Sequence, residues 1–519
     1  MKKTVAIFLT LVMMALLPCA LAEKVITAAI STAWDTMMPL DTTSNYTRMV
    51  MDQIYDRLTQ SKADGTIEPR LASSWTVNEE STAVTFKLNE AAQWSDGVPV
   101  TADDVVFTFQ MYSDPAVNAK SRYHLEYIAG VDASGAEESE DSIQVSKVDD
   151  HTVTFNLKTA MFADTFIQDL DTVYIIPKHI FEGKTAEEIN SPDLWAKPVG
   201  SGPFIYDSEI NGERIEFKAN PNYFLGAPKI DRLILRVTDS ASMLAGLING
   251  EIDMVGYGSI LVDDWDLAQE QENLECVSVP TTSYSMLLIN TAKDYLTEEV
   301  RQALSMAINR QALVGIVLQG RGEAIVTPFS SIHPYYNANV EVWYDPAKAK
   351  EMLDEANFPY DQTLQFFISS GNSVTERTAA LIVQDLAAVG VKAEITQMDF
   401  ATLMKRMMDG EHDLGIIGSG GTLDPSESRE MIAPDSQVNF SQVRDTTLAD
   451  LVDKGNAELT FETRKPIFDA YQEEMRKESP IAYLFTRDSL TAYNKSVSGL
   501  NVADFNSLNW SSWKWDKAE

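Results

Sequence analysis

The spacing of apolar positions in the first part of the chain predicts one helix among short strands. Val25–Ile30 is almost wholly apolar, which predicts an opening strand. Over 45–60 apolar residues recur every fourth position, which predicts an amphipathic helix. At 84–88 and 153–157 apolar and polar residues alternate instead, as in an antiparallel sheet with one solvated face. This part of the chain is therefore predicted to be α+β.

A helix start lies between the two alternating segments. Thr101 followed three residues later by Asp104 is a helix-capping pattern, and an acidic pair suits the positive end of the helix. We expect this helix to begin near Ala102. Residues 130–148 are acidic and weakly patterned, so an exposed excursion is expected there.

From about residue 297 onward, helical and strand patterns alternate. Thr297 precedes two glutamates and opens a helix expected to run to about Leu318. A strand at 364–368, a helix at 375–389 and a strand at 391–395 form a βαβ unit, which requires a parallel sheet. This later part is therefore predicted to be α/β. Further elements are expected at 346–356 (helix), 403–408 (helix), 414–417 (strand) and 461–477 (helix).

The amino terminus has the pattern of a secretory signal. A basic start is followed by the apolar run 6–17 and then by small residues, so cleavage is expected after Ala22. The run is shorter than the roughly 20 residues that a membrane-spanning helix needs. Cys19 raises the alternative of a lipid anchor, but Pro18 before it is a poor match to that signal. We expect an exported protein, in the periplasm or at the cell surface.

Charge and cysteine content exclude several classes of partner. The formal net charge is −36, which repels phosphate backbones and anionic membranes, so no nucleic acid is expected to bind. Beyond the signal only Cys276 remains, which excludes an intramolecular disulfide and a cysteine-based metal site. A chain of 519 residues must then rely on large cores, and two to four domains are expected.

Several sequence blocks, in this order and spacing, resemble a known family. They are Tyr55-Asp56-Arg57-Leu58, 68–75, 84–88, 94–107, 200–204, 220–224, 249–253, 300–308 and Asp424-Pro425. The chain resembles the extracellular solute-binding proteins of family 5, the oligopeptide, dipeptide and nickel binding group of ABC importers. The resemblance implies a type II periplasmic-binding-protein-like clamshell of α/β lobes that closes on its ligand by a hinge motion.

The resemblance also implies a division of the chain. Lobe I would hold 23–285 and 490–519, with an α+β subdomain inserted at 71–199. Lobe II would hold 286–489, and two hinge strands are placed near 284–289 and 483–487. The implied partners are a peptide ligand and the permease domains of an ABC transporter. We expect a monomer without cofactor or bound metal.

The proposed ligand site lies where the two lobes meet. Asp424 matches the aspartate that takes the peptide α-amine in the family. Peptide-binding members often carry tryptophan after the glycine that matches Gly418, but this chain has Ser419 there, which weakens the assignment of a peptide. The stretches 31–34 and 418–421 are candidates for strand pairing with a peptide backbone. The further candidates for ligand contact are Ala33, Trp34, Gly420, Gly421, Tyr284 and Asn439.

The sequence contains none of three common enzyme motifs in complete form. Gly183-Lys184-Thr185 lacks the earlier glycine of a phosphate loop, because Lys178 stands there. No His-Glu-x-x-His and no Gly-x-Ser-x-Gly occurs. A secreted carbohydrate hydrolase with two separated carboxylates stays an alternative at this point. Within the binding class, an oligosaccharide or a metal–chelate complex stays an alternative to a peptide.

Overall fold

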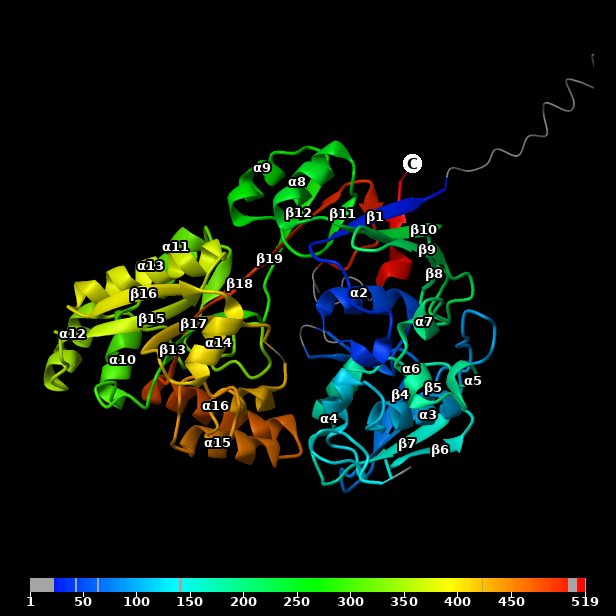
Figure 1. Ribbon diagram of the computed structural model, residues 1–519, viewed down its shortest axis with the longest axis horizontal. Coiled ribbons are helices and arrows are strands. Elements are labelled where there is room, and N and C mark those ends of the chain that lie inside the picture. The colour runs from blue at the N-terminus through cyan, green and yellow to red at the C-terminus, as the bar shows by residue number, and fades with distance from the viewer. Residues whose placement is uncertain are drawn as a thin grey trace, which may run out of the picture.

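The protein consists of two lobes joined by extended segments, as the computed structural model shows (Figure 1). The structure describes residues 23–518 apart from 43, 63–64, 140–141, 422 and 503–510. The predicted signal peptide, including Cys19, lies outside the described residues. Within the described part of the chain, no helix is long and apolar enough to cross a membrane.

Lobe I is built on a seven-stranded mixed sheet. Its central strand β1 pairs in parallel with β10 and β11, and four of its six residues are buried, as the apolar run predicts. Helices α2 (Asn45–Ile54) and α8 (Ser240–Asn249) also belong to this lobe. The strand order is β12 (Leu274–Val279), β19 (Ser489–Asn494), β11 (Met254–Tyr257), β1 (Val25–Ile30), β10 (Arg232–Val237), β9 (Arg214–Ala219) and β8 (Phe204–Ile210).

A second, four-stranded antiparallel sheet forms a subdomain within lobe I. Its strands are β4 (Ala72–Val77), β5 (Ala83–Leu88), β7 (Thr152–Asn156) and β6 (Val145–Asp149), in that order. Phe86, Phe109 and Phe155 form its aromatic core, with edge-to-face rings at 5.5 and 4.7 Å between centroids. Helix α3 (Ala102–Ser113) begins with the reciprocal hydrogen bonds between Thr101 and Asp104 that the sequence predicts.

Lobe II contains a six-stranded sheet whose βαβ unit is the predicted one. Strands β15 and β16 pair in parallel from Thr363 and Lys392 onward, with α13 between them. The strand order is β14 (Gly322–Ala324), β18 (Ile481–Arg487), β13 (Tyr284–Ile289), β17 (Leu414–Ser419), β15 (Thr363–Ser369) and β16 (Lys392–Met398). Its helices are α10 (Glu298–Ala307), α11 (Arg310–Val317), α12 (Pro346–Glu355), α13 (Ser373–Ala388), α14 (Phe400–Met408), α15 (Thr447–Asn456) and α16 (Phe461–Glu478).

Three predicted segments differ from the structure. The helix predicted over 45–60 ends at Ile54, because the following backbone is extended and hydrogen-bonds to residues 70–72. The helix predicted to run from 297 to Leu318 is two helices, because Asn309 caps a new helix by accepting a hydrogen bond from the Ala312 N–H. Residues 130–148 are not wholly exposed, since Val131, Ile143 and Val145 are buried in the subdomain core.

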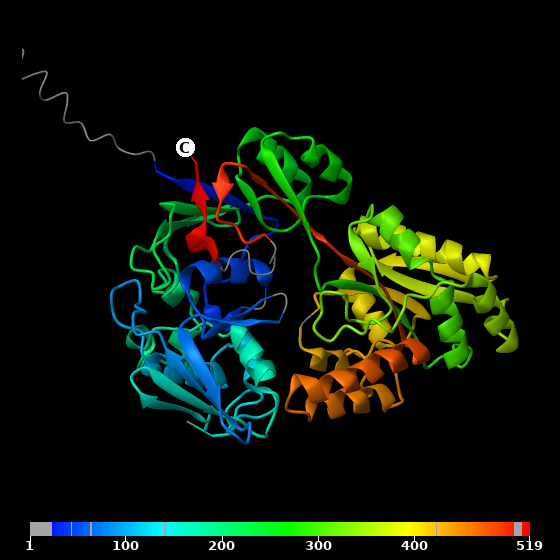
Figure 2. The ribbon, with the colours of Figure 1, turned by 180° about the vertical axis from the view of Figure 1, so that it is seen from behind.

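The chain crosses between the lobes at two neighbouring places. One is the segment 280–283 between β12 and β13, and the other is Asp488 between β18 and β19. The Ser278 hydroxyl donates to the Asp488 carboxylate at 2.7 Å, and the Thr281 hydroxyl donates to the Arg487 carbonyl at 2.7 Å. Figure 2 shows both segments crossing side by side. Paired crossings of this kind permit a hinge motion, whereas the predicted lobe boundaries stay a prediction.

A buried charged network lies within lobe I. Arg70 Nε donates to Asp56 Oδ1 at 2.7 Å, and the Tyr223 hydroxyl donates to Asp56 Oδ2 at 2.8 Å. Nearby, Arg57 pairs with Asp52, and both of these side chains are also buried. Asp56, Arg57 and Arg70 belong to the sequence blocks that carry the family resemblance, so these blocks build the frame of the lobe.

A buried histidine in lobe II makes stability depend on pH. His412 is 0% exposed, and its burial, with Lys293 as a lesser cause, lowers its pKa to about 4. The unfolded chain therefore takes up a proton more readily than the folded protein. The stability that the neutral ring contributes is present above its ordinary pKa of about 6.5 and is lost as the pH falls toward 4.

We expect His412→Gln to remove this pH dependence. The difference in unfolding free energy between wild type and variant should shrink by up to about 3 kcal/mol between pH 7 and pH 4. Urea unfolding at several pH values measures it. His151→Gln, at the turn between β6 and β7, makes the same substitution outside lobe II and is the control. A His412→Gln profile parallel to that of the wild type would contradict the expectation.

Candidate functional site

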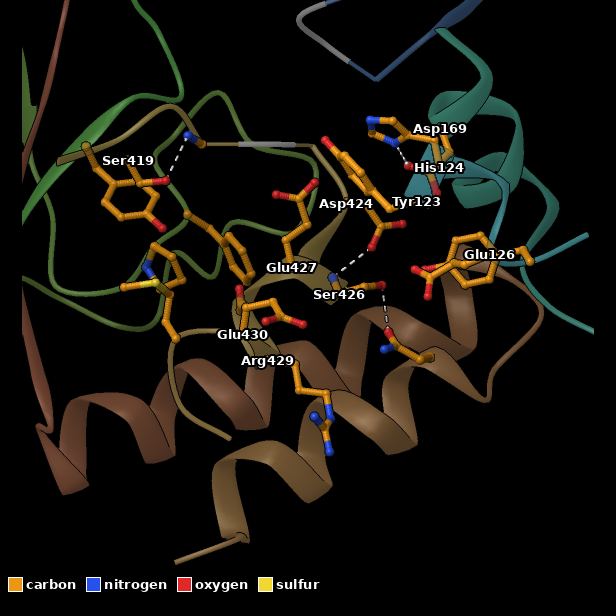
Figure 3. Close-up of a pocket in the computed structure, with 18 residues that line it drawn as sticks. Tyr123, His124, Glu126, Asp169, Ser419, Asp424, Ser426, Glu427, Arg429 and Glu430 are labelled. Atoms are coloured by element: carbon orange, nitrogen blue, oxygen red, sulfur yellow. Dashed lines mark hydrogen bonds and ion pairs between the residues drawn. The ribbon is translucent and has the colours of Figure 1, made fainter. Parts of the chain in front are cut away.

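A cavity of about 550 Å³ lies between the two lobes. Lobe II supplies the loop after β17 and the short helix η5 (Pro425–Arg429), and lobe I supplies η2 (Lys120–Leu125) with the residues that follow it. Figure 3 shows side chains from both lobes around this space. The lining residues are Tyr123, His124, Glu126, Tyr127, Asp169, Tyr284, Pro328, Phe329, Ser419, Gly421, Asp424, Ser426, Glu427, Ser428, Arg429, Glu430, Met431 and Asn456.

Asp424 occupies the N-cap of η5 and is held on several sides. Its Oδ1 accepts a hydrogen bond from the Ser426 N–H at 2.7 Å and lies 3.5 Å from an Arg464 nitrogen. Its Oδ2 accepts a hydrogen bond from the Thr165 hydroxyl. Thr165 lies on α4 (Ala163–Asp169) of the lobe I subdomain, so this bond crosses between the lobes.

Arg464 completes a cluster that bridges the lobes, here called the interlobe cluster (Phe162, Thr165, Asp424 and Arg464). The Arg464 side chain is 1% exposed, donates to the Thr165 hydroxyl at 2.9 Å and lies 5.0 Å from the centre of the Phe162 ring. Figures 1 and 2 show α4 adjoining α16 at the ends of the lobes far from the crossings. The lobes therefore touch at these ends, and Arg464 offsets part of the Asp424 charge.

Three more of the predicted residues meet Asp424 at the cavity. Tyr284 and Ser419 are register partners on β13 and β17, and both line the cavity. Gly421 also lines it and has φ +66°, in the left-handed region that favours glycine. An added Cβ there would lie 2.1 Å from the carbonyl oxygen of Thr282. The loop after β17 therefore packs directly on the segment that crosses between the lobes.

The other four predicted residues lie outside this lining. The Gly420 carbonyl accepts a hydrogen bond from the Ser283 hydroxyl at 2.9 Å. Trp34, next to Ala33, donates from its indole nitrogen to Glu209 at 3.2 Å. The Asn439 side chain closes its own loop through two hydrogen bonds with the backbone of Val443, at 2.8 and 2.9 Å. Ligand contact by these four residues stays a prediction.

The lobe I side of the cavity was not identified from the sequence. Tyr123, His124, Glu126 and Tyr127 come from one short stretch of the subdomain, and Asp169 ends α4. No motif marks this stretch. The signal that could have identified it is its composition, because two tyrosines, a histidine and an acid within five residues are unusual in a connecting segment.

Burial perturbs the acids on the lobe I side. Burial raises the pKa of Asp169, and the Asp424 carboxylate raises it further, whereas His124 Nδ1 at 3.4 Å opposes the shift. Burial also raises the pKa of Glu126, reinforced by Asp169 and by Glu430 of the opposite lobe. Acids of the two lobes therefore act on one another across the cavity, against the opposing effects of Lys158 and His124. Across the described ranges, no group of three or more His, Cys, Asp or Glu side chains is placed to hold a metal ion.

The fold and this cavity define a class of protein. Two lobes on separate sheets, two adjacent crossings and a cavity walled by both lobes are the features of a two-lobed solute-binding protein of the type II periplasmic class, as predicted. Residues 66–440 match the bacterial extracellular solute-binding proteins, family 5 Middle, and the chain belongs to this family. Members of this family act in the periplasm or outside the cell.

Individual relatives cover most of the chain. It is 29% identical over 478 residues to the dipeptide-binding protein of Escherichia coli, with 86% of each chain covered. It is also 29% identical over 412 residues to heme-binding protein A of Haemophilus influenzae, covering 75% of this chain and 73% of that protein. The crystal structure of the ABC transporter substrate binding protein CtaP from Listeria monocytogenes superposes with a TM-score of 0.86 at 25% identity, covering 96% and 100% of the two chains.

The family assignment confirms the predicted class of function. Its members are binding proteins of ABC importers rather than enzymes, so the alternative of a secreted hydrolase is set aside. A solute is bound and handed to a transporter without a bond being made or broken.

Proposed function

We propose that this protein captures a short peptide between its lobes and delivers it to the permease of an ABC importer. The observation that carries the proposal is the cavity between the lobes, which joins the loop after β17 to a carboxylate-rich wall of lobe I. Similar chains support the choice of a peptide, because the E. coli relative is a dipeptide-binding protein. The peptide amino group would lie near Asp424, with Ser419, Gly421 and Tyr284 beside it.

A second cavity next to the crossings is lined by three arginines and by the acids Asp263 and Asp488. It has a volume of about 370 Å³, and Arg321, Arg377 and Arg487 are among its lining residues. Arg321 and Arg377 pair with acids of lobe I, whereas Arg487 has no salt bridge to any described residue. A free carboxylate pairs well with guanidinium groups. Arg487 is therefore the arginine of this cavity that we propose for a ligand carboxylate.

The remaining features of the proposal concern the whole chain. We propose export through a signal peptide covering residues 1–22, with Cys19 removed rather than lipidated, and a monomeric protein. Lobe I would hold 23–285 and 490–519, with the subdomain at 71–199, and lobe II would hold 286–489. Closure about the crossings would present the shape that the permease recognises.

Native mass spectrometry of the purified protein tests the proposed ligand class. We expect a ladder of added masses that correspond to short peptides and that disappear after mild denaturation and refolding. The stripped protein should then bind Ala-Ala-Ala in calorimetry and unfold at a higher temperature with it, because a ligand that binds only the folded state stabilises it. A single sugar or heme mass, together with no heat from the peptide, would replace the proposal.

A further inference from the structure

The charge of the residues that line the cavity indicates which peptides would bind there. The position of this cavity as a ligand site does not depend on its charge, since both lobes wall it and the chain belongs to a solute-binding family. Five carboxylates line it. Glu126 and Asp169 come from lobe I, and Asp424, Glu427 and Glu430 come from lobe II.

The positive groups that act on Glu126 are Lys158 and His124, and their effect is smaller than that of the burial of this carboxylate. Figure 3 shows the Arg429 side chain pointing away from the labelled carboxylates. Its guanidinium donates to Asp453 at 2.8 Å and to Asp435 at 3.2 Å. Within the described ranges, the Glu126 carboxylate forms no salt bridge. The Glu430 carboxylate accepts a hydrogen bond from the Ser436 hydroxyl at 3.1 Å, which supplies no positive charge. A negative potential is therefore left for a ligand to neutralise.

Acids of the two lobes also face one another. The raised pKa of Glu126 has a contribution from Glu430, and that of Asp169 has one from Asp424. Like charges that approach in a partly buried space repel, so closure of the lobes over an empty or anionic cavity costs free energy. A positive group between the lobes converts this repulsion into attraction.

Aromatic rings beside the acids give an independent sign of the ligand. Tyr123, Tyr127, Tyr284 and Phe329 line the same cavity. Tyr123 is 54% exposed, an unusually open position for a large ring in a space between lobes. Aromatic faces bind cations, and they also pack against the alkyl stems of lysine and arginine. Rings next to carboxylates therefore suit a long side chain with a charged end.

We propose that this cavity selects peptides that carry a lysine or arginine side chain in addition to the amino terminus. This inference rests on the proposed peptide function and adds the charge class of the ligand. Glu126 and Glu430, one from each lobe, would receive the basic side chain while its stem lies on the tyrosines. Asp424 stays with the amino terminus and Arg464.

Calorimetry with three matched peptides tests the inference. Ala-Lys-Ala should bind the stripped wild-type protein roughly tenfold more tightly than Ala-Ala-Ala, the size expected for one added charge pair in a partly solvated cavity. Ala-Glu-Ala should bind at least about tenfold more weakly than Ala-Ala-Ala, for the same reason with the opposite sign. The three peptides share length and termini, so their ranking reports the charge of the side chain.

A matched pair of variants locates the effect. Glu126→Gln should weaken Ala-Lys-Ala roughly tenfold more than it weakens Ala-Ala-Ala, because only Ala-Lys-Ala places a side-chain charge beside this residue. Glu270→Gln makes the same charge change at an exposed site outside the lining and should alter neither affinity. Equal binding of the three peptides by wild type, or equal loss for both peptides in Glu126→Gln, would overturn the inference and leave the peptide function standing. Binding of none of them would overturn both.

Discussion

Asp56→Asn is expected to lower the unfolding free energy by about 3–5 kcal/mol, because it leaves a buried arginine without its counter-charge. Arg70 and Asp56 are both buried, and the Arg70 Nε donates to Asp56 at 2.7 Å. The Arg70 guanidinium also lies 4.8 Å from the Trp513 ring centre, which restricts its movement toward water. Asparagine keeps the shape of the side chain, so the expected loss reports the missing charge.

Urea unfolding of variant and wild type measures this loss. The control is Asp409→Asn, which removes the acid from the exposed pair Lys405–Asp409 of α14. Exposed pairs on a helix contribute about 0.5 kcal/mol or less, so the control should unfold nearly as the wild type does. If the two variants shifted the unfolding midpoint by the same small amount, the network would not be the frame of lobe I described above.

Gly421→Ala is expected to have the second large effect, on stability and on ligand binding together. The left-handed backbone costs alanine about 1–2 kcal/mol, and the clash of its Cβ with the Thr282 carbonyl adds about 1–3 kcal/mol. The clash falls on the segment that crosses between the lobes. We therefore expect an unfolding free energy lower by about 2–5 kcal/mol and peptide affinity reduced at least tenfold, because the loop after β17 must move.

The neighbouring glycine supplies the control. An added Cβ at Gly420 would meet nothing within 4 Å, and its φ lies outside the left-handed region. Gly420→Ala should therefore change stability by less than about 0.5 kcal/mol. Thermal unfolding and calorimetry with the same peptide test both variants. Equal behaviour of the two alanine variants would show that the close approach of Gly421 to Thr282 does not hold the site.

Several elements follow from local pattern alone. The spacing of apolar residues identifies β1 and the βαβ unit of lobe II, and Thr101 with Asp104 marks the start of α3. These are short-range effects, since a strand or a helix cap depends on neighbours within a few residues. The predicted helix over 45–60 is wrong beyond Ile54 for the same reason. The local apolar spacing continues past Ile54, but hydrogen bonds to residues 70–72 hold the backbone extended.

The candidate site also has one part that could be predicted from the sequence and one part that could not. Asp424, Ser419 and Gly421 could be proposed because they lie in one loop that the family resemblance marks. The opposing wall, with Glu126 and Asp169, comes from a subdomain some 250 residues or more earlier and carries no motif. Trp34 and Asn439, also proposed from the sequence, hydrogen-bond to Glu209 and Val443, and their contact with a ligand stays a prediction.

The sequence by itself determined the class of the protein: family membership, two α/β lobes, and the absence of enzyme motifs. Periodicity and local motifs predict the individual helices and strands, and the ordered sequence blocks carry the resemblance that implies the family and its two lobes. Only the tertiary structure decided that Thr165 and Arg464 enclose Asp424, and that acids of two lobes share one cavity. The contacts of Thr165 with Asp424 and Arg464 join residues more than 250 positions apart, and packing of the lobes, not local pattern, brings them together.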